Sequence, residues 1–365
     1  MPRTPDPAHP LGSDFLQGIQ ETLNSFLDQQ ESRVAAIGAA PMLDLARTFT
    51  SGGKRLRPAF CYWGHVAAAG HPEDPTALLR AAASLDLLHV SALVHDDLID
   101  ASETRRGVPS AHRQFAQRHR FAGGRGDGDE FGTSGAILLG DLLLIWSLEL
   151  FESSGMPADA VTRARPLLEA MRTEVTCGQF LDVSAAYGVT GSDGPSDELA
   201  VARKILEYKS ASYSVRRPAQ AGAALGGADE ELIRALGVYG SALGAAFQLR
   251  DDVLGVYGDS SVTGKPSGDD LREGKRTILL LTALERGDGT QRRGLEAMLG
   301  RADLTDEQVA EARVIIDATG ALAHVEELIE RGSSEALAAL GGAEMTADGR
   351  TALVRLAELS VQRDR

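Results

Sequence analysis

The chain has 365 residues, of which 43% are hydrophobic and 5% aromatic, and its formal net charge is −15 at pH 7. This length and composition allow one large domain or two ordinary ones with an extensive core. The negative charge argues against nucleic acid as a partner and against general affinity for an anionic membrane. An anionic substrate is still compatible with it, because a local cationic cluster or a bound metal ion can invert the local field.

The N-terminal stretch, MPRTPDPAHP, is rich in proline and has no apolar segment. We predict that residues 1–12 form a disordered tail and that residues 13–365 form a single helical domain. Since no secretory signal is visible and Cys61 and Cys177 lack metal-binding spacing, we expect a cytoplasmic protein with two reduced thiols.

Membrane insertion is not expected from the apolar runs of the sequence. The longest, residues 136–146, is too short to span a bilayer and carries Asp141. We therefore predict no stable membrane insertion.

Apolar residues recur mostly at spacings of three and four, which predicts a nearly all-helical chain. In chain order, we predict helices over residues 13–37, 75–99, 134–153, 158–187, 197–225, 230–257 and 276–286, with peripheral helices from residue 306 onward. Clusters of glycine, proline and short polar residues predict loops at 50–58, 105–110, 122–130, 187–197 and 287–293. The loop at 122–130 is glycine-rich and acidic, so we expect it to be mobile.

Two aspartate clusters stand near the C-terminal ends of predicted helices. HDDLID places Asp96 and Asp100 one helical turn apart, and LRDDVLG places Asp251 and Asp252 in a similar position. Like charges at this spacing repel, and the helix macrodipole adds to the repulsion. One cluster alone is more often a solvated acidic face, but two could face each other across a cavity. Carboxylates without Cys or His suit Mg²⁺, which keeps several waters and is completed by substrate phosphates.

Basic side chains follow or accompany these clusters. Arg105 and Arg106 come directly after the first one, and guanidinium groups bind phosphate oxygens bidentately. Other candidates, each of which alone is more often an ordinary solvated charge, are Lys54, Arg55, Arg57, Lys209, Lys265 and Lys275. Together these residues predict two anion sites, one mediated by metal and one formed by basic side chains alone.

Ordered motifs resemble those of the trans-isoprenyl diphosphate synthases, the polyprenyl synthetase family. They are GGKRLRP, HDDLIDASETRRG, GDLLL, GQFLD, EYKSAS, FQLRDDVLG and TGKPSGDDLREGK, spread over about residues 51–277. The resemblance implies an all-α isoprenoid-synthase fold, a large helical bundle around a central cavity, and a homodimer. It also implies condensation of isopentenyl diphosphate with dimethylallyl, geranyl or farnesyl diphosphate, with three Mg²⁺ ions bound beside the allylic substrate.

The resemblance also assigns roles to individual residues. The implied metal ligands are Asp96, Asp97, Asp100, Asp251 and Asp252. Ligands of the allylic diphosphate would be Arg105, Lys209 and Lys265, with Lys275 closing over it. Ligands of isopentenyl diphosphate would be Lys54, Arg57, His89 and Arg106. Residues beside the developing carbocation would be Lys209, Ser210 and Gln248, with Gln179 and Asp182 as helpers.

His89 has two interpretations, a ligand and a satisfied core histidine. It lies seven residues before Asp96, within about 20° of the same helical face, which favours the ligand role. A general base is not evident, so we expect the released pyrophosphate to take the proton. The cations would stabilise that pyrophosphate as it departs, in a cavity that excludes water.

The second aspartate motif departs from the family at its last position, where DDVLG has Gly255 in place of an aspartate. We expect activity to survive, because Asp251 and Asp252 remain and Asp259 is close. The alternative is a weakened site that has lost a ligand.

Product length is predicted from the helix that precedes Asp96. Each turn advances about 5.4 Å, comparable with one isoprene unit, so side chains one to three turns back form successive floors for the growing chain. Family members that stop at fifteen carbons have aromatic residues at the first floor, where this chain has Ser91 and Ala92. Leu88 and Leu85 follow. We predict geranylgeranyl diphosphate, with farnesyl or longer products as alternatives.

Two further functions are compatible with part of the pattern. A class I terpene cyclase shares the fold and the first aspartate motif, but it does not need GGKRLRP, His89 and a second arginine. A non-catalytic partner subunit of a heteromeric synthase tends to lose an aspartate motif, as Gly255 suggests. Mg²⁺-dependent pyrophosphate release that requires isopentenyl diphosphate would separate the synthase from both.

Overall fold

The computed structural model describes residues 4–189, 197–258 and 268–361, and nearly all of its regular structure is helical. This confirms the predicted all-α fold class. In chain order the elements are α1 (Ser13–Ile37), α2 (Ala40–Thr50), α3 (Leu56–Ala69), α4 (Thr76–Ile99), β1 (Thr104–Arg105), β2 (Val108–Pro109), α5 (Ala111–Phe121), α6 (Gly128–Glu152), α7 (Ala158–Ala186), α8 (Glu198–Ile205), the π-helix η1 (Leu206–Arg216), α9 (Arg217–Leu225), α10 (Glu230–Tyr257), α12 (Asp269–Glu273), α13 (Ile278–Arg286), α14 (Gly289–Glu296), α15 (Asp306–Ala318), α16 (Ala321–Gly341) and α17 (Ala347–Val361).

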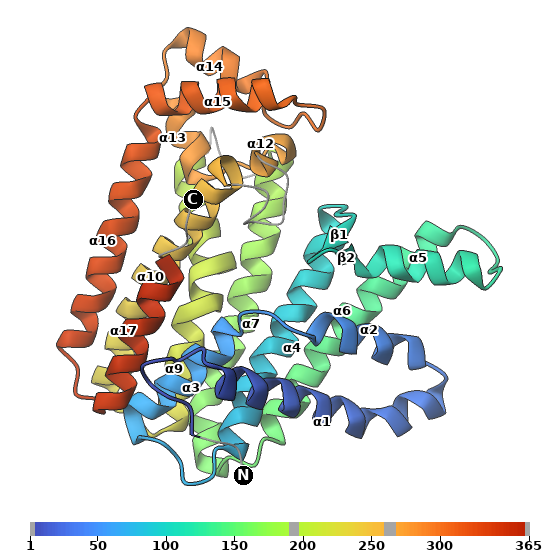
Figure 1. Ribbon diagram of the computed structural model, residues 1–365, viewed down its shortest axis with the longest axis vertical. Coiled ribbons are helices and arrows are strands. Elements are labelled where there is room, and N and C mark those ends of the chain that lie inside the picture. The colour runs from blue at the N-terminus through green and yellow to red at the C-terminus, as the bar shows by residue number, and fades with distance from the viewer. Residues whose placement is uncertain (1–3, 190–196, 259–267, 362–365) are drawn as a thin grey trace.

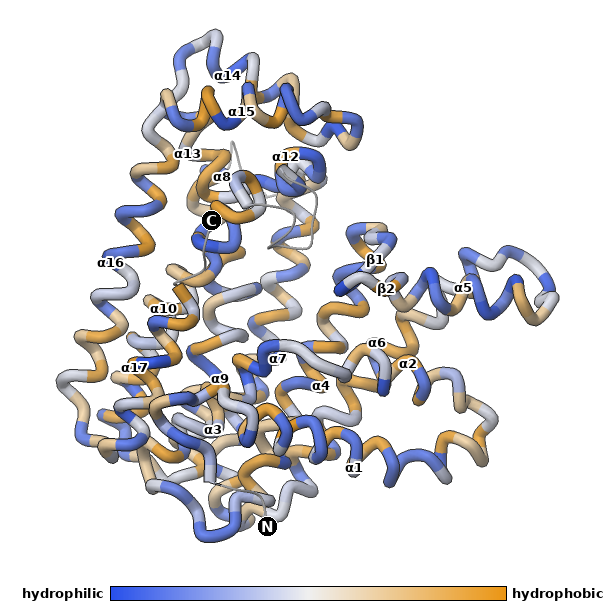
Figure 2. The backbone as a smooth tube through the Cα atoms, in the orientation of Figure 1, coloured by the Kyte–Doolittle hydropathy of each residue, from blue (hydrophilic) through white to orange (hydrophobic). Residues whose placement is uncertain are grey.

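The long helices form a bundle. Helix α4 packs along α6, α10 along α16 and α3 along α9. In Figure 1, α14 and α15 cross one end of this bundle, whereas the β1–β2 hairpin and α5 project from its side. Hydrophilic and hydrophobic residues alternate along α1 and α16 in Figure 2, as expected for helices with one face on the core.

The core consists of a large hydrophobic cluster and a second one beside the predicted site. The first includes the fully buried aromatic residues Tyr62, Trp63 and Tyr239. The second joins the C-terminal half of α10 to α13, α15 and α16. Burial of each such large side chain stabilises the fold by about 1.5–3 kcal/mol. The ends of α10 and α13 that carry site residues are therefore anchored in rigid packing.

Residues 4–12, for which we predicted disorder, form turns against the helices. The indole Nε1 of Trp63 donates to the carbonyl of Pro10 at 3.1 Å, and Pro5 and Pro10 are buried. The buried indole nitrogen of α3 thus finds its acceptor in this N-terminal segment.

Three predicted loops are partly helical, and in the one predicted at 50–58 helix α3 begins at Leu56. Helix α6 begins at Gly128, inside the loop predicted at 122–130, because the Asp127 side chain accepts from the amides of Asp129 and Glu130 at 2.6 and 3.3 Å. The loop predicted at 287–293 is wrong from Gly289 onward, since a capping box on Asp288 starts α14 there.

Helices α4, α6 and α10 are long and apolar enough to cross a membrane on length and composition alone. In α4, 72% of the most apolar stretch is buried inside the protein, and in α6 and α10 the share is 44%. Helix α6 extends well beyond the apolar run 136–146, so segment length no longer supports the predicted absence of membrane insertion, which stays a prediction.

Candidate active site

A cavity of about 640 Å³ lies among α4, α7, η1, α10, α12 and the start of α13. Its volume is in the range of small-molecule sites, roughly 300–1,000 Å³. The predicted site residues that line it are Lys54, Asp96, Asp182, Lys209, Ser210, Gln248, Asp251, Asp252 and Lys275. Aspartates from both clusters therefore face one cavity, as the sequence suggested. Lys265 and Asp259 lie outside the described residues.

On the α4 side, Asp96 is held by polar side chains from two other elements. Its Oδ1 accepts from Gln179 Nε2 at 2.9 Å and lies 3.3 Å from Lys209 Nζ. Lys209 Nζ also donates to Asp182 Oδ2 at 2.5 Å. Burial alone would lower the pKa of Lys209, but the charges of Asp96 and Asp182 raise it. The ammonium group is thus fixed at the cavity wall next to the first aspartate.

Asp97 and Arg105 bind each other. Arg105 Nε lies 2.9 and 3.1 Å from the two carboxylate oxygens of Asp97. Asp97 is 2% exposed. Burial raises the pKa of Asp97 in spite of this cation. The sequence assigned these residues to a metal ion and to the allylic diphosphate, and both roles stay predictions.

The hairpin that carries Arg105 and Arg106 explains why two adjacent arginines reach different neighbours. Arg106 and Gly107 both have positive φ, 53° and 79°, as a two-residue type I′ turn requires. Arg105 pairs with Val108 in the ladder, and Arg106 lies at the turn. An added Cβ on Gly53 would lie 3.0 Å from the Arg106 guanidinium, so the GGKRLRP loop and the hairpin meet here.

Asp100 ends α4 as its C-cap and is exposed at this edge. Its amide donates to the Asp96 carbonyl at 2.8 Å. Burial of part of the carboxyl, followed by the Asp96 charge, raises the pKa of Asp100 to about 6. The like-charge repulsion predicted from the one-turn spacing is therefore present in the structure.

On the α10 side, Asp252 is 7% exposed and accepts from Gln248 Nε2 at 2.9 Å. Burial, and then the charge of Asp270 on α12, raise the pKa of Asp252 to about 8. Lys275 Nζ lies 2.6 Å from Glu273 and 3.5 Å from Asp270. Sequence reasoning missed Asp270, because only its neighbourhood in the fold distinguishes it from the adjacent Asp269.

The predicted ligands of isopentenyl diphosphate other than Lys54, which are Arg57, His89 and Arg106, do not line this cavity. Arg57 and His89 instead form a basic group around the ring of Tyr213. The Arg57 guanidinium carbon lies 4.0 Å from the ring centroid of Tyr213, and Arg57 Nη2 donates to Ser214 Oγ at 2.7 Å. His89 Nδ1 and the Tyr213 hydroxyl are 2.6 Å apart. Burial and then the charges of Arg57 and Arg106 lower the pKa of His89 well below its usual value, so its ring is neutral.

Arg57 keeps donor capacity, since its buried Nε has no hydrogen-bond partner among the described residues. Arg55 has a different role: its side chain forms a buried ion pair with Asp86 and donates to Gln20 Oε1 at 2.6 Å and to the Thr50 carbonyl at 2.5 Å. Arg55 therefore fixes the GGKRLRP loop, while Arg57 belongs to the basic group with His89. Tyr213, absent from the predicted set, carried no signal in the sequence beyond an aromatic residue near EYKSAS.

Lys209 and Ser210 lie on η1, the π-helical middle of the helix predicted at 197–225. Such wide turns are rare and often mark functional sites. Gly178 of α7 lets the backbones approach, because an added Cβ there would lie 2.5 Å from the Lys209 amide nitrogen. The helix was predicted, but its π-helical middle was not.

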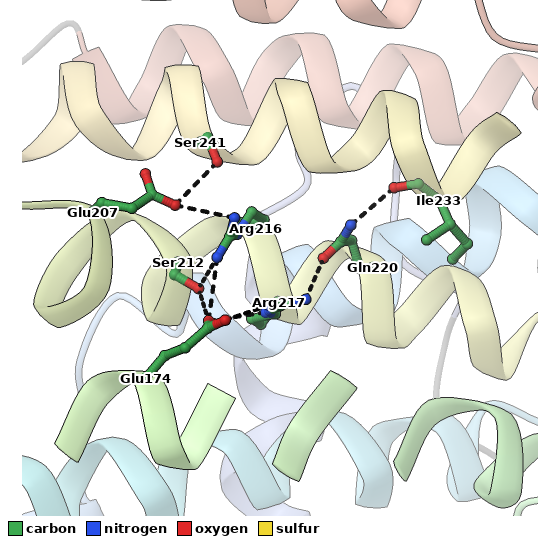
Figure 3. Close-up of polar contacts among 8 residues, drawn as sticks. All are labelled: Glu174, Glu207, Ser212, Arg216, Arg217, Gln220, Ile233 and Ser241. Atoms are coloured by element: carbon green, nitrogen blue, oxygen red, sulfur yellow. Dashed lines mark hydrogen bonds and ion pairs between the residues drawn. The ribbon is translucent and has the colours of Figure 1, made fainter. Parts of the chain in front are cut away.

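A polar network connects η1 to α7 and α10 (Figure 3). Glu174 of α7 accepts hydrogen bonds from Ser212 and from Arg217, whose Nε is 2.9 Å away, and Arg216 Nη2 lies 3.3 Å from it. Burial opposes the charge of Glu174, but the hydrogen bonds from Arg217 and Ser212 keep its pKa below the usual value. Glu207 binds Arg216 at 3.2 Å and accepts from Ser241 at 3.2 Å, which ties η1 to α10.

The predicted chain-length residues lie in the packed part of α4. Ser91 is 3% exposed and its Oγ donates to the Gly140 carbonyl of α6 at 2.7 Å. Leu88 and Leu85 are buried, and Ala92 is partly buried against the main core. None of the four lines the 640 Å³ cavity, so their role as floors stays a prediction.

The donor chemistry of the cavity fits a hard divalent cation completed by substrate. Among the described residues, no three His, Cys, Asp or Glu side chains form a preformed metal cluster. Asp96, Asp251 and Asp252 instead face the cavity from two helices. Mg²⁺ suits such an arrangement, since it keeps several waters and binds one or two carboxylates plus phosphate oxygens.

Comparison with known proteins identifies the family. The polyprenyl synthetase family model matches residues 42–316. This chain belongs to the polyprenyl synthetase family. The crystal structure of geranylgeranyl pyrophosphate synthase from Corynebacterium glutamicum, complexed with isoprenyl diphosphate and magnesium, is 39% identical and covers 96% of this chain and 99% of that one, with a TM-score of 0.89.

Curated polyprenyl synthetases are also similar over most of their length. The short chain isoprenyl diphosphate synthase of Methanothermobacter thermautotrophicus is 32% identical over 86% of this chain and 88% of its own. The geranylgeranyl diphosphate synthase of Methanosarcina mazei is 30% identical over 76% of each chain. These proteins share a reaction class and are named for different product ranges.

Proposed function

We propose that this protein is a trans-prenyltransferase that condenses isopentenyl diphosphate with an allylic diphosphate. The observation that carries the proposal is the shared cavity: Asp96 and Asp251 face it from α4 and α10, and Lys209 and Lys275 line it as well. The basic group of Arg57 and His89 offers a second diphosphate site that needs no metal ion. Membership of the polyprenyl synthetase family supports the same reaction.

The aspartates of the two clusters would hold Mg²⁺ beside the allylic diphosphate, with three ions as the family resemblance implies. The ligands would be Asp96, Asp251 and Asp252, which line the cavity, together with Asp97 and Asp100. Mg²⁺, when bound, neutralises negative charge on the pyrophosphate as it leaves. Asp97 would have to release Arg105 in order to hold the ion, since the two side chains pair in this structure. The guanidinium would then be available to the diphosphate.

The chain's own cations orient the two substrates. Lys209 sits 3.3 Å from Asp96 and can bind the allylic diphosphate next to it. Arg57 and Arg106 bind isopentenyl diphosphate, while His89, whose pKa is lowered well below its usual value, donates or accepts a hydrogen bond without adding charge. Gln248 and Ser210, both at the cavity wall, face the allylic carbon that becomes positive. The pyrophosphate, once released, takes the proton that completes the reaction.

Geranylgeranyl diphosphate is the proposed product. The side chain of Ala92 is small and that of Ser91 is bound to Gly140, so neither forms an aromatic floor one turn before Asp96. Leu88 and Leu85 then provide the next large side chains along α4. The relatives named geranylgeranyl synthases are in accord with this length.

We further propose a homodimer. Helix α6 exposes Phe131, Leu138 and Ile145 at intervals of seven residues, and these side chains are 48%, 57% and 57% exposed. Residues seven apart lie on one face of a helix, so they form an apolar stripe. A second copy of this chain would remove that stripe from water.

The test is product analysis after incubation of the purified protein with Mg²⁺, isopentenyl diphosphate and each of the three allylic primers. Mass spectrometry of dephosphorylated products should show geranylgeraniol as the main peak. A farnesol endpoint would retain the reaction and overturn the product. Pyrophosphate release without isopentenyl diphosphate would indicate a cyclase, and no release with any primer would indicate a non-catalytic partner subunit.

A further inference from the structure

Gly255 stands at the end of the second aspartate motif, and a buried carboxylate fills the space beside it. An added Cβ on Gly255 would lie 2.0 Å from Oδ2 of Asp270 and 2.4 Å from its Cγ. Asp270 is 7% exposed and lines the cavity together with Asp251 and Asp252. A side chain at position 255 and the observed position of the Asp270 carboxylate therefore exclude each other.

Other close-packed glycines of α10 serve a different purpose. Added Cβ atoms at Gly240 and Gly244 would meet backbone atoms of η1, at 2.3 Å from Arg216 Cα and 2.5 Å from Ala211 Cα. Those glycines allow two helices to approach. At Gly255, by contrast, the three nearest atoms all belong to one carboxyl group. The absent side chain leaves room for a charged group that faces the substrate cavity.

The backbone around Asp270 is fixed, so the carboxylate is brought to this place by α12. Gly268 and Gly274 flank the helix with φ of 73° and 69°, values that favour glycine. Arg272 binds the Leu304 carbonyl, and the amide of Lys275 donates to the Asp270 carbonyl at 3.0 Å. Lys275 Nζ lies 3.5 Å from the Asp270 carboxylate and partly offsets its charge.

We propose that Asp270 supplies the third carboxylate of the second aspartate cluster, and that Gly255 is required because any side chain there displaces it. This inference rests on the proposed function and deepens it, since it names a further group that holds Mg²⁺ and diphosphate. Where the second aspartate motif ends in Gly255, the third carboxylate would then come from another motif of the family, TGKPSGDDLREGK. Restoring aspartate at position 255 would not repair the site, because it would place a fourth carboxylate against Asp252 and Asp270.

The steric part is tested without metal, by thermal unfolding in the presence of EDTA. Gly255→Ala should have a lower Tm than Gly341→Ala, because the Asp270 carboxylate must move aside, although alanine is otherwise the better helix former. The same substitution in an Asp270→Ala background should cost much less, because the colliding carboxylate is gone. Gly341→Ala is the matched control, since an added Cβ there would meet no atom within 4 Å. Equal losses in both backgrounds would overturn the steric link.

The ligand role of Asp270 is tested by measuring how tightly the protein binds Mg²⁺ and inorganic pyrophosphate. Two readouts are used: calorimetry and the Mg²⁺-dependent increase in Tm. Asp270→Asn and Gly255→Asp should each weaken binding at least about 10-fold, as expected for loss or displacement of a ligand-holding carboxylate. The exchange variant Gly255→Asp with Asp270→Ala moves the carboxylate to the family's usual position, and it should recover most of the affinity.

Two results would overturn the role of Asp270. One is wild-type affinity in Asp270→Asn, and the other is an exchange variant that binds no better than Asp270→Ala. Failure of the wild-type protein to bind Mg²⁺ and pyrophosphate at all would instead count against the proposed function, and with it against any ligand role of Asp270. The EDTA experiment separates these cases, because it depends on packing alone.

Discussion

At the scale of single residues, Asp96 both lines the cavity and is held by polar side chains of other elements. It lines the cavity and is surrounded by Gln179 and Lys209, at 2.9 and 3.3 Å. We expect Asp96→Asn to reduce Mg²⁺-dependent turnover at least about 100-fold, because an amide binds Mg²⁺ poorly and contributes no negative charge. The measurement is pyrophosphate release with isopentenyl diphosphate and farnesyl diphosphate.

The control for this substitution is Asp303→Asn, at an exposed carboxylate paired with Arg301 on the surface. It should retain wild-type turnover. Near-normal turnover in Asp96→Asn, with unchanged circular dichroism, would exclude the metal role of Asp96.

His65 gives a second prediction at this scale, for the dependence of stability on pH. It is 7% exposed on α3, and burial lowers its pKa from 6.5 to about 4. The unfolded chain therefore binds a proton between pH 6.5 and 4 that the folded chain does not. Stability supplied by the neutral ring is present above pH 6.5 and is lost as the pH falls, by about 2 kcal/mol between pH 7 and pH 5.

Urea unfolding at pH 7 and pH 5 measures this effect. In His65→Gln the difference in the free energy of unfolding between the two pH values should be smaller than in the wild type by about 2 kcal/mol. His324→Gln, at a partly exposed position of α16, is the control and should behave as the wild type. The same pH dependence in His65→Gln and the wild type would contradict the assignment.

The predicted residues at the cavity belong to motifs in which the type and spacing of each residue indicate its chemistry. Asp96, Lys209 and Asp251 are examples, since carboxylates and cations at family spacing indicate their roles. Tyr213 and Asp270 were not predictable in this way. Their roles depend on neighbours distant in sequence, His89 and Gly255, and a side chain that matters through a tertiary contact leaves no local pattern.

At the scale of elements, η1 is a helix whose type could not be predicted from the spacing of apolar residues. Apolar spacing predicts a helix over 197–225 but does not separate an α-helix from a π-helix, because the hydrogen bonds of the two differ by one residue in span. The network around Glu174 holds η1 against α7 and α10 (Figure 3). Glu207 lies two residues before Lys209, and Ser212 and Arg216 lie after it, so the network stabilises the element that presents Lys209.

Glu174→Ala should reduce the free energy of unfolding by roughly 1–3 kcal/mol, because it leaves Arg217 partly buried without its carboxylate and leaves Arg216 with Glu207 alone. Urea unfolding measures this loss. Glu152→Ala is the matched control: it removes a more exposed carboxylate from Arg165, and we expect less than about 1 kcal/mol. Faster hydrogen exchange of the η1 amides in Glu174→Ala should accompany the loss. Equal stability of the two variants would show that the network does not hold η1.

Side chains of helix α4 are predicted to set the chain length of the product. Ala92→Phe places an aromatic ring one turn before Asp96 and should shorten the main product from twenty to fifteen carbons, because each turn corresponds to one isoprene unit of about 5 Å. Mass spectrometry of the dephosphorylated products checks this. Ala77→Phe, in the first turn of the same helix, is the control and should leave the product unchanged. An unchanged product in Ala92→Phe would refute the floor argument.

At the scale of the whole molecule, the fold was predictable because long amphipathic helices and an ordered set of motifs agree with one another. Predictions failed where short-range capping decides the structure. Asp288 and Gln291 form a capping box inside a segment whose composition indicates a loop, and Asp127 starts α6 six residues before the predicted start at 134. The N-terminal turns depend on a distant partner, Trp63, which composition does not reveal.

At the scale of the whole molecule, the exposed apolar face of α6 bears on how two chains assemble. Ile145 lies at the end of the apolar stripe and is 57% exposed. A buried aspartate without a partner is costly, so Ile145→Asp should raise the dimer dissociation constant at least about 100-fold. Val314→Asp is the matched control: Val314 is 67% exposed on α15, away from the stripe, and its substitution should leave the mass unchanged.

Light scattering after size-exclusion chromatography at micromolar concentration distinguishes the outcomes. The wild type and Val314→Asp should have the mass of two chains, and Ile145→Asp that of one. A wild-type mass of one chain would overturn the homodimer. A dimeric Ile145→Asp would move the interface to another face, because the charge would then lie outside the buried area.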